Sequence, residues 1–400
     1  MPEPADDRSL QRPVVAGVVT ALVGFTSSFA VVLSGLRAVG ASPEQAASGL
    51  FALTVVFGLL MIGLALWTRM PVTLAWSTPG AALLVSTGTV GGGWPAAVGA
   101  FVLIGVLLAL TGALGWLGRA ARAIPAPIAQ GMLAGILLEL CLAPVEAVAV
   151  APWSVLPVIV VWLLATRWIP RWAVPLALVA ALVSIGVSIA TSDTTVDRAS
   201  LVPQLTFTSP TLSVAAVVGI AIPLAIVTLA SQNIPGVAIM RGFGYDVPWR
   251  ASMLTTGAGT SAAGLFGGHA INLAALSAAL AAGDEAGPRD RRWIAAVTAG
   301  GGYLLLALTS GALVTLSEAA PAGIVETVAG LALLATFAAA ILAALSDADH
   351  RTSAVVAFVV AASGLRLAGV GAAFWALVAG LATRLLLESP TRGETRGEAD

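Results

Sequence analysis

The stretch WSTPGAALL, residues 76–84, decides how this chain folds. In it, Thr78 followed by Pro79 is typical of a helix start, because a threonine side chain caps free backbone N–H groups and proline is tolerated at the first helical position. We therefore expect Thr78 to be the N-cap of a helix and residues 72–76 before it to be extended. An ordinary proline kink within one continuous helix is the alternative.

This helix start lies inside an apolar run, and apolar runs recur along the whole chain. Of the 400 residues, 58% are hydrophobic and only 10% are charged, whereas roughly 25% are charged in an average soluble domain. So few charges cannot cover the surface of a soluble protein of this size, and runs of about 20 residues are long enough to cross a bilayer. The composition predicts an all-α polytopic membrane protein, in which non-helical backbone is tolerated only where protein or a water-filled cavity surrounds it.

The apolar runs between Pro, Gly and Arg residues predict fourteen membrane spans. The third, ninth and tenth are the weakest helices, since they are rich in Gly, Ser and Thr. The predicted spans are residues 13–36, 46–68, 71–88, 94–118, 125–143, 153–168, 172–190, 211–231, 249–262, 264–282, 292–316, 320–345, 351–368 and 371–388.

The positions of the arginines support this count and orient the chain. No lysine is present, so all 19 basic residues are arginine. With fourteen spans and a cytoplasmic N-terminus, only Arg37, Arg198 and Arg366 lie on the outer side, and the other arginines lie on the cytoplasmic side. Because loops rich in arginine stay in the cytoplasm, the sequence predicts that both termini are cytoplasmic.

A weak internal repeat relates the two halves of the chain. A shift of 204 residues places Ser27 on Ser231, with five further identities nearby. The shift maps the first span onto the eighth, and an odd number of spans reverses orientation, as in the inverted repeats of transporters. We therefore expect two seven-span repeats, residues 1–200 and 201–400, with chance similarity as the alternative.

The same repeat pairs the third span with the tenth, which carries the stretch GLFGGHAINLA at residues 264–274. Asn272 is expected to cap a second half-helix there. The two half-helices would direct their N-termini, with free N–H groups and positive dipole ends, towards one point near the midplane. Such a point suits an anion, above all a carboxylate. Ser77, Thr78, Gly80, His269 and Asn272 are therefore candidate binding residues.

Polar groups in the first and eighth spans are further binding candidates. The eighth span ends in ASQNIPG, residues 230–236, where polar side chains are costly unless they line a cavity or bond to neighbours; helix-end capping is the alternative. In the first span, two phenylalanines flank hydroxyl residues and suit an aromatic ligand, with serines bonded to their own helix as the alternative. The candidates are Phe25, Ser27 and Phe29 in the first span and Ser231, Gln232 and Asn233 in the eighth.

Two ionisable residues are candidates for coupling protons to transport. His269 lies in the expected break of the tenth span, and histidine changes its charge near neutral pH. Glu139 lies inside the fifth span, where an acid is a functional candidate. The alternatives are a structural histidine and a glutamate that reaches the membrane surface or bonds to backbone.

Several other classes of protein are not expected. The chain lacks a Walker A motif, a His/Glu zinc motif and a Gly-x-Ser-x-Gly elbow, so we expect neither an enzyme nor a bound cofactor. Its single cysteine, Cys141, leaves no metal site of the Cys type. The sequence also has no basic block that would indicate nucleic-acid binding.

At three of these segments the sequence resembles the benzoate/proton symporters of the BenE family. The segments are residues 76–81, 230–236 and 264–274, and the resemblance extends over essentially the whole chain. It implies the fold of the uracil and anion transporters, with fourteen spans divided between a core domain and a gate domain. The core would comprise residues 13–118 and 211–316, and the gate residues 125–190 and 320–388.

The resemblance also implies a proton-coupled importer of benzoate, or of a similar aromatic carboxylate, in a bacterial inner membrane. Uracil symporters look similar but carry glutamates where this chain matches Ser231 and His269, and the loss of two carboxylates suits a substrate that brings its own. Nucleobase or inorganic-anion transport on the same fold, and an uncoupled anion channel, are the alternatives. The expected partners are the carboxylate, protons and lipid, with a homodimer left open.

Overall fold

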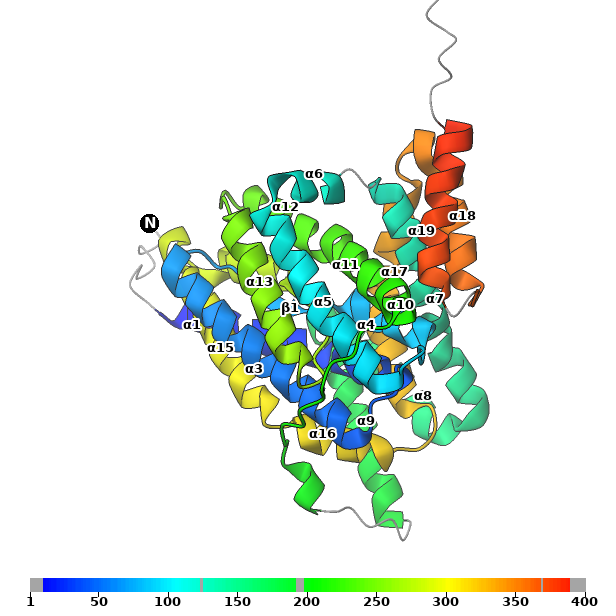
Figure 1. Cartoon of the computed structure of the whole chain (residues 1–400). Coiled ribbons are helices and arrows are strands. Elements are labelled where there is room, and N and C mark those ends of the chain that lie inside the picture. Colours follow the sequence, from blue (N-terminus) through cyan, green and yellow to red (C-terminus); the bar gives the residue numbers. More distant parts are fainter. Residues whose placement is uncertain (1–9, 123–124, 192–197, 368–369, 389–400) are drawn as a thin grey trace, which may run out of the picture.

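The computed structural model describes residues 10–122, 125–191, 198–367 and 370–388, and its regular structure is helical apart from two short strands (Figure 1). The helices and strands are α1 (Gln11–Thr26), α2 (Phe29–Ala38), α3 (Pro43–Thr68), β1 (Leu74–Trp76), α4 (Thr78–Thr87), α5 (Gly93–Ala113), α6 (Gly115–Arg122), α7 (Ala126–Val150), α8 (Pro152–Trp168), α9 (Ala173–Thr191), α10 (Val214–Ala216), α11 (Ile222–Thr228), α12 (Ile234–Gly242), α13 (Trp249–Gly264), β2 (Ile271–Leu273), α14 (Ala275–Ala282), α15 (Trp293–Ala307), α16 (Ser310–Glu318), α17 (Ile324–Leu345), α18 (Arg351–Ala362) and α19 (Ala372–Thr383). Short π-helical turns are η3 (Val217–Ala221), η4 (Leu229–Asn233) and η8 (Arg384–Glu388), and short 3-10 turns are η1 (Pro170–Trp172), η2 (Arg198–Leu201), η5 (Asp284–Ala286), η6 (Arg289–Arg291) and η7 (Ala348–His350).

Seven helical segments within the described residues are long and apolar enough to cross a membrane. Helices α15 and α16 meet the same criterion as a pair, across a bend of 49°. The chain is thus a helical polytopic membrane protein, in which shorter elements occupy the remaining predicted spans. The seven segments are Gln11–Ala38, Pro43–Thr68, Gly93–Ala113, Ala126–Val150, Pro170–Thr191, Val214–Gly242 and Ile324–Leu345.

Some helix boundaries differ from the predicted spans. The eighth span was expected to end at residue 231, but the helix continues to Gly242, because Pro235 falls in the first turn of α12, where proline is tolerated. The thirteenth predicted span contains a helix of only 12 residues, α18, whereas α19 continues without a break through η8 to Glu388 and matches the fourteenth predicted span. Helix α18 ends early because Gly364, with φ of 64°, follows its last turn.

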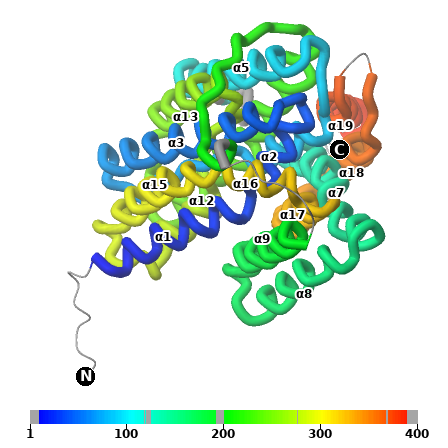
Figure 2. Tube along the Cα trace, turned by 90° about the horizontal axis from the view of Figure 1, so that it is seen from below, coloured from blue at the N-terminus to red at the C-terminus, as the bar shows by residue number. Residues whose placement is uncertain are grey.

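The helices form two groups on either side of the molecule (Figures 1 and 2). Helices α1, α3, α5, α13 and α15 lie on one side, where α3 packs on α15 and α5 packs on α13. Helices α7, α8, α9 and α17 lie on the other side, where α7 packs on α17 and α8 packs on α9. Helix α2 contacts both α3 and α17 and so lies between the groups.

Glycines permit the closest helix contacts in the first group. A Cβ atom on Gly257 of α13 would lie 2.5 Å from the backbone oxygen of Gly105 on α5. A Cβ atom on Gly300 of α15 would likewise lie 2.8 Å from the backbone oxygen of Gly58 on α3. Small residues at such contacts let helix backbones approach within van der Waals distance in a membrane protein.

The segment that joins the two halves of the chain is an extended strap, residues 204–213, across α3, α5 and α13. Thr206 N donates a hydrogen bond to Ser48 Oγ at 2.8 Å. Thr208 N donates to the Leu265 carbonyl at 2.9 Å, and the indole N–H of Trp94 donates to Thr208 Oγ1 at 3.0 Å. These bonds fasten the strap to the first group of helices, which they help to hold together as one unit.

The variant Gly257→Val is expected to lower the thermal unfolding midpoint of the purified protein, because the added atoms would have to displace the backbone of α5. Overpacking of this kind costs about 1–3 kcal/mol. Gly63→Ala on α3 is the matched control, since nothing lies within 4 Å of an added Cβ there. Equal midpoints for the two variants in a thermal-shift assay would contradict the close contact between α5 and α13.

Candidate functional site

Strands β1 and β2 pair antiparallel and form a short ribbon. Most of the predicted site residues lie in this ribbon or next to it. Ser77 N donates to the Ala270 carbonyl at 2.9 Å, and Ala274 N donates to the Thr73 carbonyl at 3.0 Å, so the pairing extends beyond the strands. Helix α4 follows β1 and helix α14 follows β2, which brings both helix N-termini to the same ribbon. The paired residues are Leu74 with Leu273, Ala75 with Asn272 and Trp76 with Ile271.

Ser77 caps helix α4, and the predicted cap, Thr78, is wrong by one residue. The reason is that Ser77 keeps an extended backbone while Thr78 is already helical. Ser77 Oγ accepts a hydrogen bond from Gly80 N at 3.2 Å and another from Thr228 Oγ1 at 2.9 Å. A Cβ atom on Gly80 would lie 2.2 Å from Leu224 Cδ1, so the start of α4 is held tightly against α11.

Asn233 joins the eighth segment to strand β2. It is fully buried in the π turn η4, and its Oδ1 accepts a hydrogen bond from Leu273 N at 2.8 Å. Helix-end capping, the alternative reading of this stretch, is wrong because the helix continues into α12. Gln232 is half-buried, and Ser231 Oγ donates to the Val227 carbonyl of its own helix at 2.6 Å.

Asn272 lies within β2 and does not cap α14, as the sequence had predicted. The N-cap position is Ala274, which makes no side-chain capping bond, because the pairing with β1 keeps Asn272 in an extended strand. Asn272 is fully buried and its Nδ2 donates to the Leu273 carbonyl at 2.9 Å. Within the described residues, Asn272 Oδ1 and Asn233 Nδ2 have no hydrogen-bond partner, so one unpaired acceptor and one unpaired donor belong to side chains that bond Leu273.

Aromatic rings pack on the same ribbon. The rings of Phe25 and Phe29 are nearly parallel, with centroids 5.9 Å apart, and the Phe25 centroid lies 5.4 Å from that of Trp76. The indole N–H of Trp76 donates to Ser28 Oγ at 2.7 Å, at the break between α1 and α2. Ser27 is half-buried, and its Oγ donates to a carbonyl of α1 at 3.2 Å. The alternative of serines bonded to their own helix therefore describes Ser27.

Three residues that contribute to this arrangement were missed as site residues by sequence reasoning. They are Trp76, Ser28 and Thr228. Trp76 opens the stretch WSTPGAALL and Ser28 lies between Ser27 and Phe29, so their neighbours in the sequence were an available signal. The bond from Thr228 to Ser77 joins residues 151 positions apart, and the sequence carries no signal for that contact.

His269 lies at the edge of the ribbon, next to Ala270. Its side chain is fully buried, and neither ring nitrogen makes a hydrogen bond of good geometry within the part of the chain that the structure describes. The segment before it packs on α3, since a Cβ atom on Gly268 would lie 2.8 Å from Leu53 Cγ. The backbone of His269 therefore lies directly next to the ribbon, and its side chain is enclosed by helices of the first group.

Glu139 is not brought to the ribbon. It lies on α7, and its side chain is exposed, as are those of Leu142, Val145 and Glu146 on the same part of the helix. The structure therefore separates the two candidates for proton coupling, with His269 enclosed near the ribbon and Glu139 on an outer surface of α7.

The side chains gathered at the ribbon carry no fixed charge. Positive potential there comes from the N-terminal ends of α4 and α14, where backbone N–H groups lack helical partners. An anion at this point would meet these N–H groups, the free Asn233 Nδ2 and the rings of Phe25 and Phe29. Within the described residues, no group of three or more His, Cys, Asp or Glu side chains could hold a metal ion.

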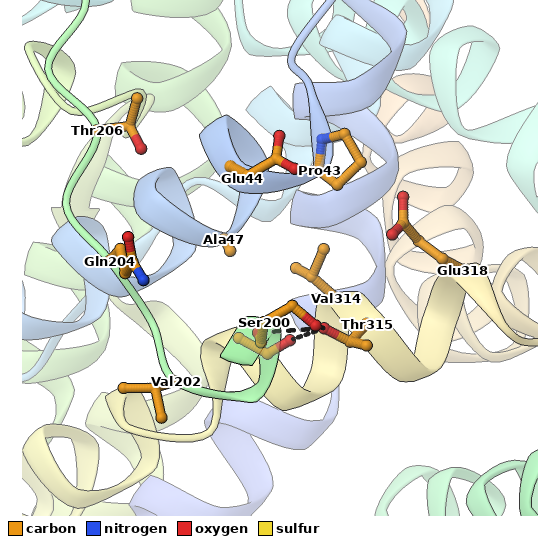
Figure 3. A pocket seen from close by; sticks show the side chains of 11 residues that line it. Pro43, Glu44, Ala47, Ser200, Val202, Gln204, Thr206, Val314, Thr315 and Glu318 are labelled. Carbon is orange, nitrogen blue, oxygen red and sulfur yellow. Dashed lines mark hydrogen bonds between the residues drawn. The ribbon is translucent and has the colours of Figure 1, made fainter. Parts of the chain in front are cut away.

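The hollows of the molecule lie to the sides of this site. A narrow apolar crevice of about 20 Å³ lies next to Phe29, where α2 and α16 meet α9 and α17. A larger cavity of about 480 Å³ has the carboxylates of Glu44 and Glu318 in its wall, together with Gln204 and hydroxyl residues (Figure 3). None of the predicted site residues lines this larger cavity, and its acidic wall does not suit an anion.

Comparison with known proteins assigns the chain to a family. A family model described as "Benzoate membrane transport protein", BenE, matches residues 9–386. The "Inner membrane protein YdcO" of Escherichia coli is 38% identical over 92% of this chain and 93% of its own length. The "Benzoate membrane transport protein" of Acinetobacter baylyi is 28% identical over 94% of this chain and 95% of its own.

Solved structures of anion transporters share the fold. The transmembrane domain of the cyanobacterial bicarbonate transporter BicA aligns with a TM-score of 0.63 at 16% identity, over 94% of this chain and 98% of that one. The murine Solute Carrier 26 family member A9 anion transporter, in an inward-facing state, aligns with a TM-score of 0.64 at 13% identity, over 96% of this chain and 69% of that one.

The variant Ser77→Ala is expected to destabilise the protein by about 0.5–2 kcal/mol, because it removes the cap of α4 and the partner of Thr228. Ser86→Ala, on the same helix, is the control, since Ser86 is half-buried and its Oγ donates to the Leu83 carbonyl of its own helix at 3.0 Å. Thermal unfolding in detergent measures both effects. A midpoint for Ser77→Ala equal to that of Ser86→Ala would contradict the capping role.

Proposed function

Since this chain belongs to the BenE family of benzoate membrane transport proteins, we propose that it imports benzoate, or a similar aromatic carboxylate, together with protons across a bacterial inner membrane. The family match over residues 9–386 and the relationship to an inner membrane protein support the substrate class and the compartment. As a member of a transporter family, the chain is not an enzyme.

One observation carries the substrate class: two helix N-termini and an aromatic cluster meet at the β1–β2 ribbon. The carboxylate of the substrate would lie near Thr78, Gly80 and Asn272, where the positive ends of the helix dipoles of α4 and α14 stabilise negative charge. Its aromatic ring would pack against Phe25 and Phe29, which already lie against the ribbon.

Further polar groups would complete the binding site. Asn233 Nδ2 has no protein partner within the described residues and is placed to donate to a carboxylate oxygen. Ser231 and Gln232 would add hydrogen bonds after a change of rotamer. Ser27 and Ser77 already bond to backbone and would act by shaping the break in span 1 and the start of α4.

The proposed topology has fourteen spans in two inverted repeats, with both termini in the cytoplasm. In it, β1 with α4 and β2 with α14 each form one broken span. The first group of helices belongs to the core domain and the second group to the gate domain. The strap supports this division, because its hydrogen bonds to Ser48, Trp94 and Leu265 all lie within the core. Transport proceeds by movement of the core against the gate in alternating access, and assembly as a homodimer stays a prediction.

Competition for uptake separates this proposal from its alternatives. Purified protein in proteoliposomes is expected to accumulate labelled benzoate when the outside is more acidic, and unlabelled aryl carboxylates are expected to compete at least tenfold better than uracil or bicarbonate. Competition mainly by uracil or bicarbonate would favour a nucleobase or inorganic-anion carrier on this fold. Benzoate currents that ignore the pH gradient in a planar bilayer would favour an uncoupled channel.

The variant His269→Ala is expected to abolish pH-driven accumulation of benzoate while benzoate exchange across the membrane persists, because exchange needs no net proton transfer. His350→Ala is the matched control, since His350 is the second histidine and lies in the turn η7, where its Nδ1 is 3.0 Å from Asp347 Oδ2. Full proton coupling in His269→Ala would show that this assignment is wrong. If Glu139→Gln lost proton coupling and His269→Ala kept it, the proton-coupling role would belong to Glu139.

A further inference from the structure

A groove lies at the end of the molecule that is predicted to face the cytoplasm. Its volume is about 430 Å³, and it lies between the first turns of α1, the last turns of α14, and the turns η1 and η5. Its floor is apolar, and its rim carries charged side chains. The lining residues are Gln11, Arg12, Val15, Ala16, Val19, Arg171, Leu280 and Glu285.

A bidentate ion pair crosses this groove. Arg171 Nη1 lies 2.9 Å from Glu285 Oε2, and Arg171 Nη2 lies 3.0 Å from Glu285 Oε1. Such paired bonds fix the direction as well as the distance between guanidinium and carboxylate. The hydrogen bonds from Arg171 also lower the pKa of Glu285, which keeps the carboxylate charged.

The two partners belong to different groups of helices. Arg171 lies in η1, the connection between α8 and α9, which pack on each other in the second group. Glu285 lies in η5, directly after α14, and its neighbour Asp284 is bonded to Arg12 and Arg292 of the first group. The pair therefore ties the proposed gate to the proposed core.

The two helices that wall the groove, α1 and α14, both reach the β1–β2 ribbon at their other ends, since Phe25 of α1 packs on Trp76 and α14 begins directly after β2. Val15 and Val19 lie one turn apart on the same face of α1, and Phe25 follows six residues later, about 9 Å along the helix. Exposure falls along α1 from the groove towards the ribbon, since Val15 is 53% exposed, Val19 is half-buried and Phe25 is 2% exposed. On the other wall, Leu280 lies five residues after Ala275, the first residue of α14.

We propose that this groove is the cytoplasmic mouth of the substrate path and that the Arg171–Glu285 pair is the latch that holds core and gate together across it. The inference rests on the proposed alternating access. When core and gate separate on this side, the two ion-pair partners part and the apolar walls of α1 and α14 become accessible. The same Arg171 guanidinium is then free to meet the carboxylate of the departing substrate.

Labelling of a single cysteine tests the latch without reference to the substrate. The native Cys141 is replaced by alanine, Val19→Cys is introduced, and a membrane-impermeant maleimide is applied to inside-out and right-side-out membrane vesicles. Glu285→Ala and Arg171→Ala are expected to raise the labelling rate in inside-out vesicles about two- to fivefold, as loss of an exposed ion pair allows. High salt is also expected to raise the labelling rate of the protein that keeps both Arg171 and Glu285, because salt screens the ion pair.

Matched variants distinguish loss of the Arg171–Glu285 ion pair from the general effect of removing a charge nearby. Asp290→Ala and Arg167→Ala remove exposed charges of the same two connecting regions and are expected to leave the rate unchanged. The exchanged pair, Arg171→Glu with Glu285→Arg, is expected to restore slow labelling. Equal rates in Glu285→Ala and Asp290→Ala, or labelling from right-side-out vesicles only, would overturn the proposal.

Benzoate uptake in the same vesicles distinguishes failure of the latch from failure of the proposed function. Faster labelling in Glu285→Ala, without any benzoate uptake by the unmodified protein, would support the proposed latch and refute benzoate as the substrate. Normal uptake with unchanged labelling would keep the substrate and refute the latch.

Discussion

An extended backbone inside an apolar molecule persists only if its N–H and C=O groups are paired, and the pairing of β1 with β2 meets this constraint. The outer edge of β2 is satisfied by side chains, since Thr260 Oγ1 accepts from Ile271 N at 2.9 Å and Asn233 Oδ1 accepts from Leu273 N. Polar side chains of the neighbouring helices thus form hydrogen bonds with the backbone of the ribbon in the absence of any ligand. Because the ribbon fixes where α4 and α14 begin, the candidate site depends on these hydrogen bonds.

Features of the candidate site could be predicted from the sequence only where they depend on residues that are neighbours in the chain. Pro79 and the hydroxyl residues before it predicted a helix start, and α4 begins at Thr78; the cap moved by one residue because two adjacent hydroxyl residues can both cap. Asn272 was assigned to a helix end because capping is a local pattern, whereas its real place in β2 depends on pairing with Ala75, 197 residues earlier in the chain. The bonds of Asn233 and Thr228 were out of reach for the same reason.

Helix length was the other limit of sequence reasoning. Arginine positions set the predicted orientation, but they do not determine where a helix ends inside an apolar run. The end of α18 depends on the positive φ of Gly364, and the continuity of the eighth segment depends on π-helical turns that place Pro235 within α12. Neither backbone feature follows from hydropathy, which treats both regions as uniform apolar stretches.

The two halves of the candidate site differ in chemistry although the predicted repeat would relate them. The shift of 204 residues places Phe29 on Asn233, so the break in the first span presents an aromatic ring where the eighth segment presents an amide. The helix starts differ as well, since Ser77 caps α4 while Ala274 leaves the start of α14 without a side-chain cap. A symmetric ion would use only part of such a site. A ligand with one flat apolar end and one anionic end would use both, because its ring would meet the phenylalanines while its charge would meet the helix N-termini and the free Asn233 Nδ2.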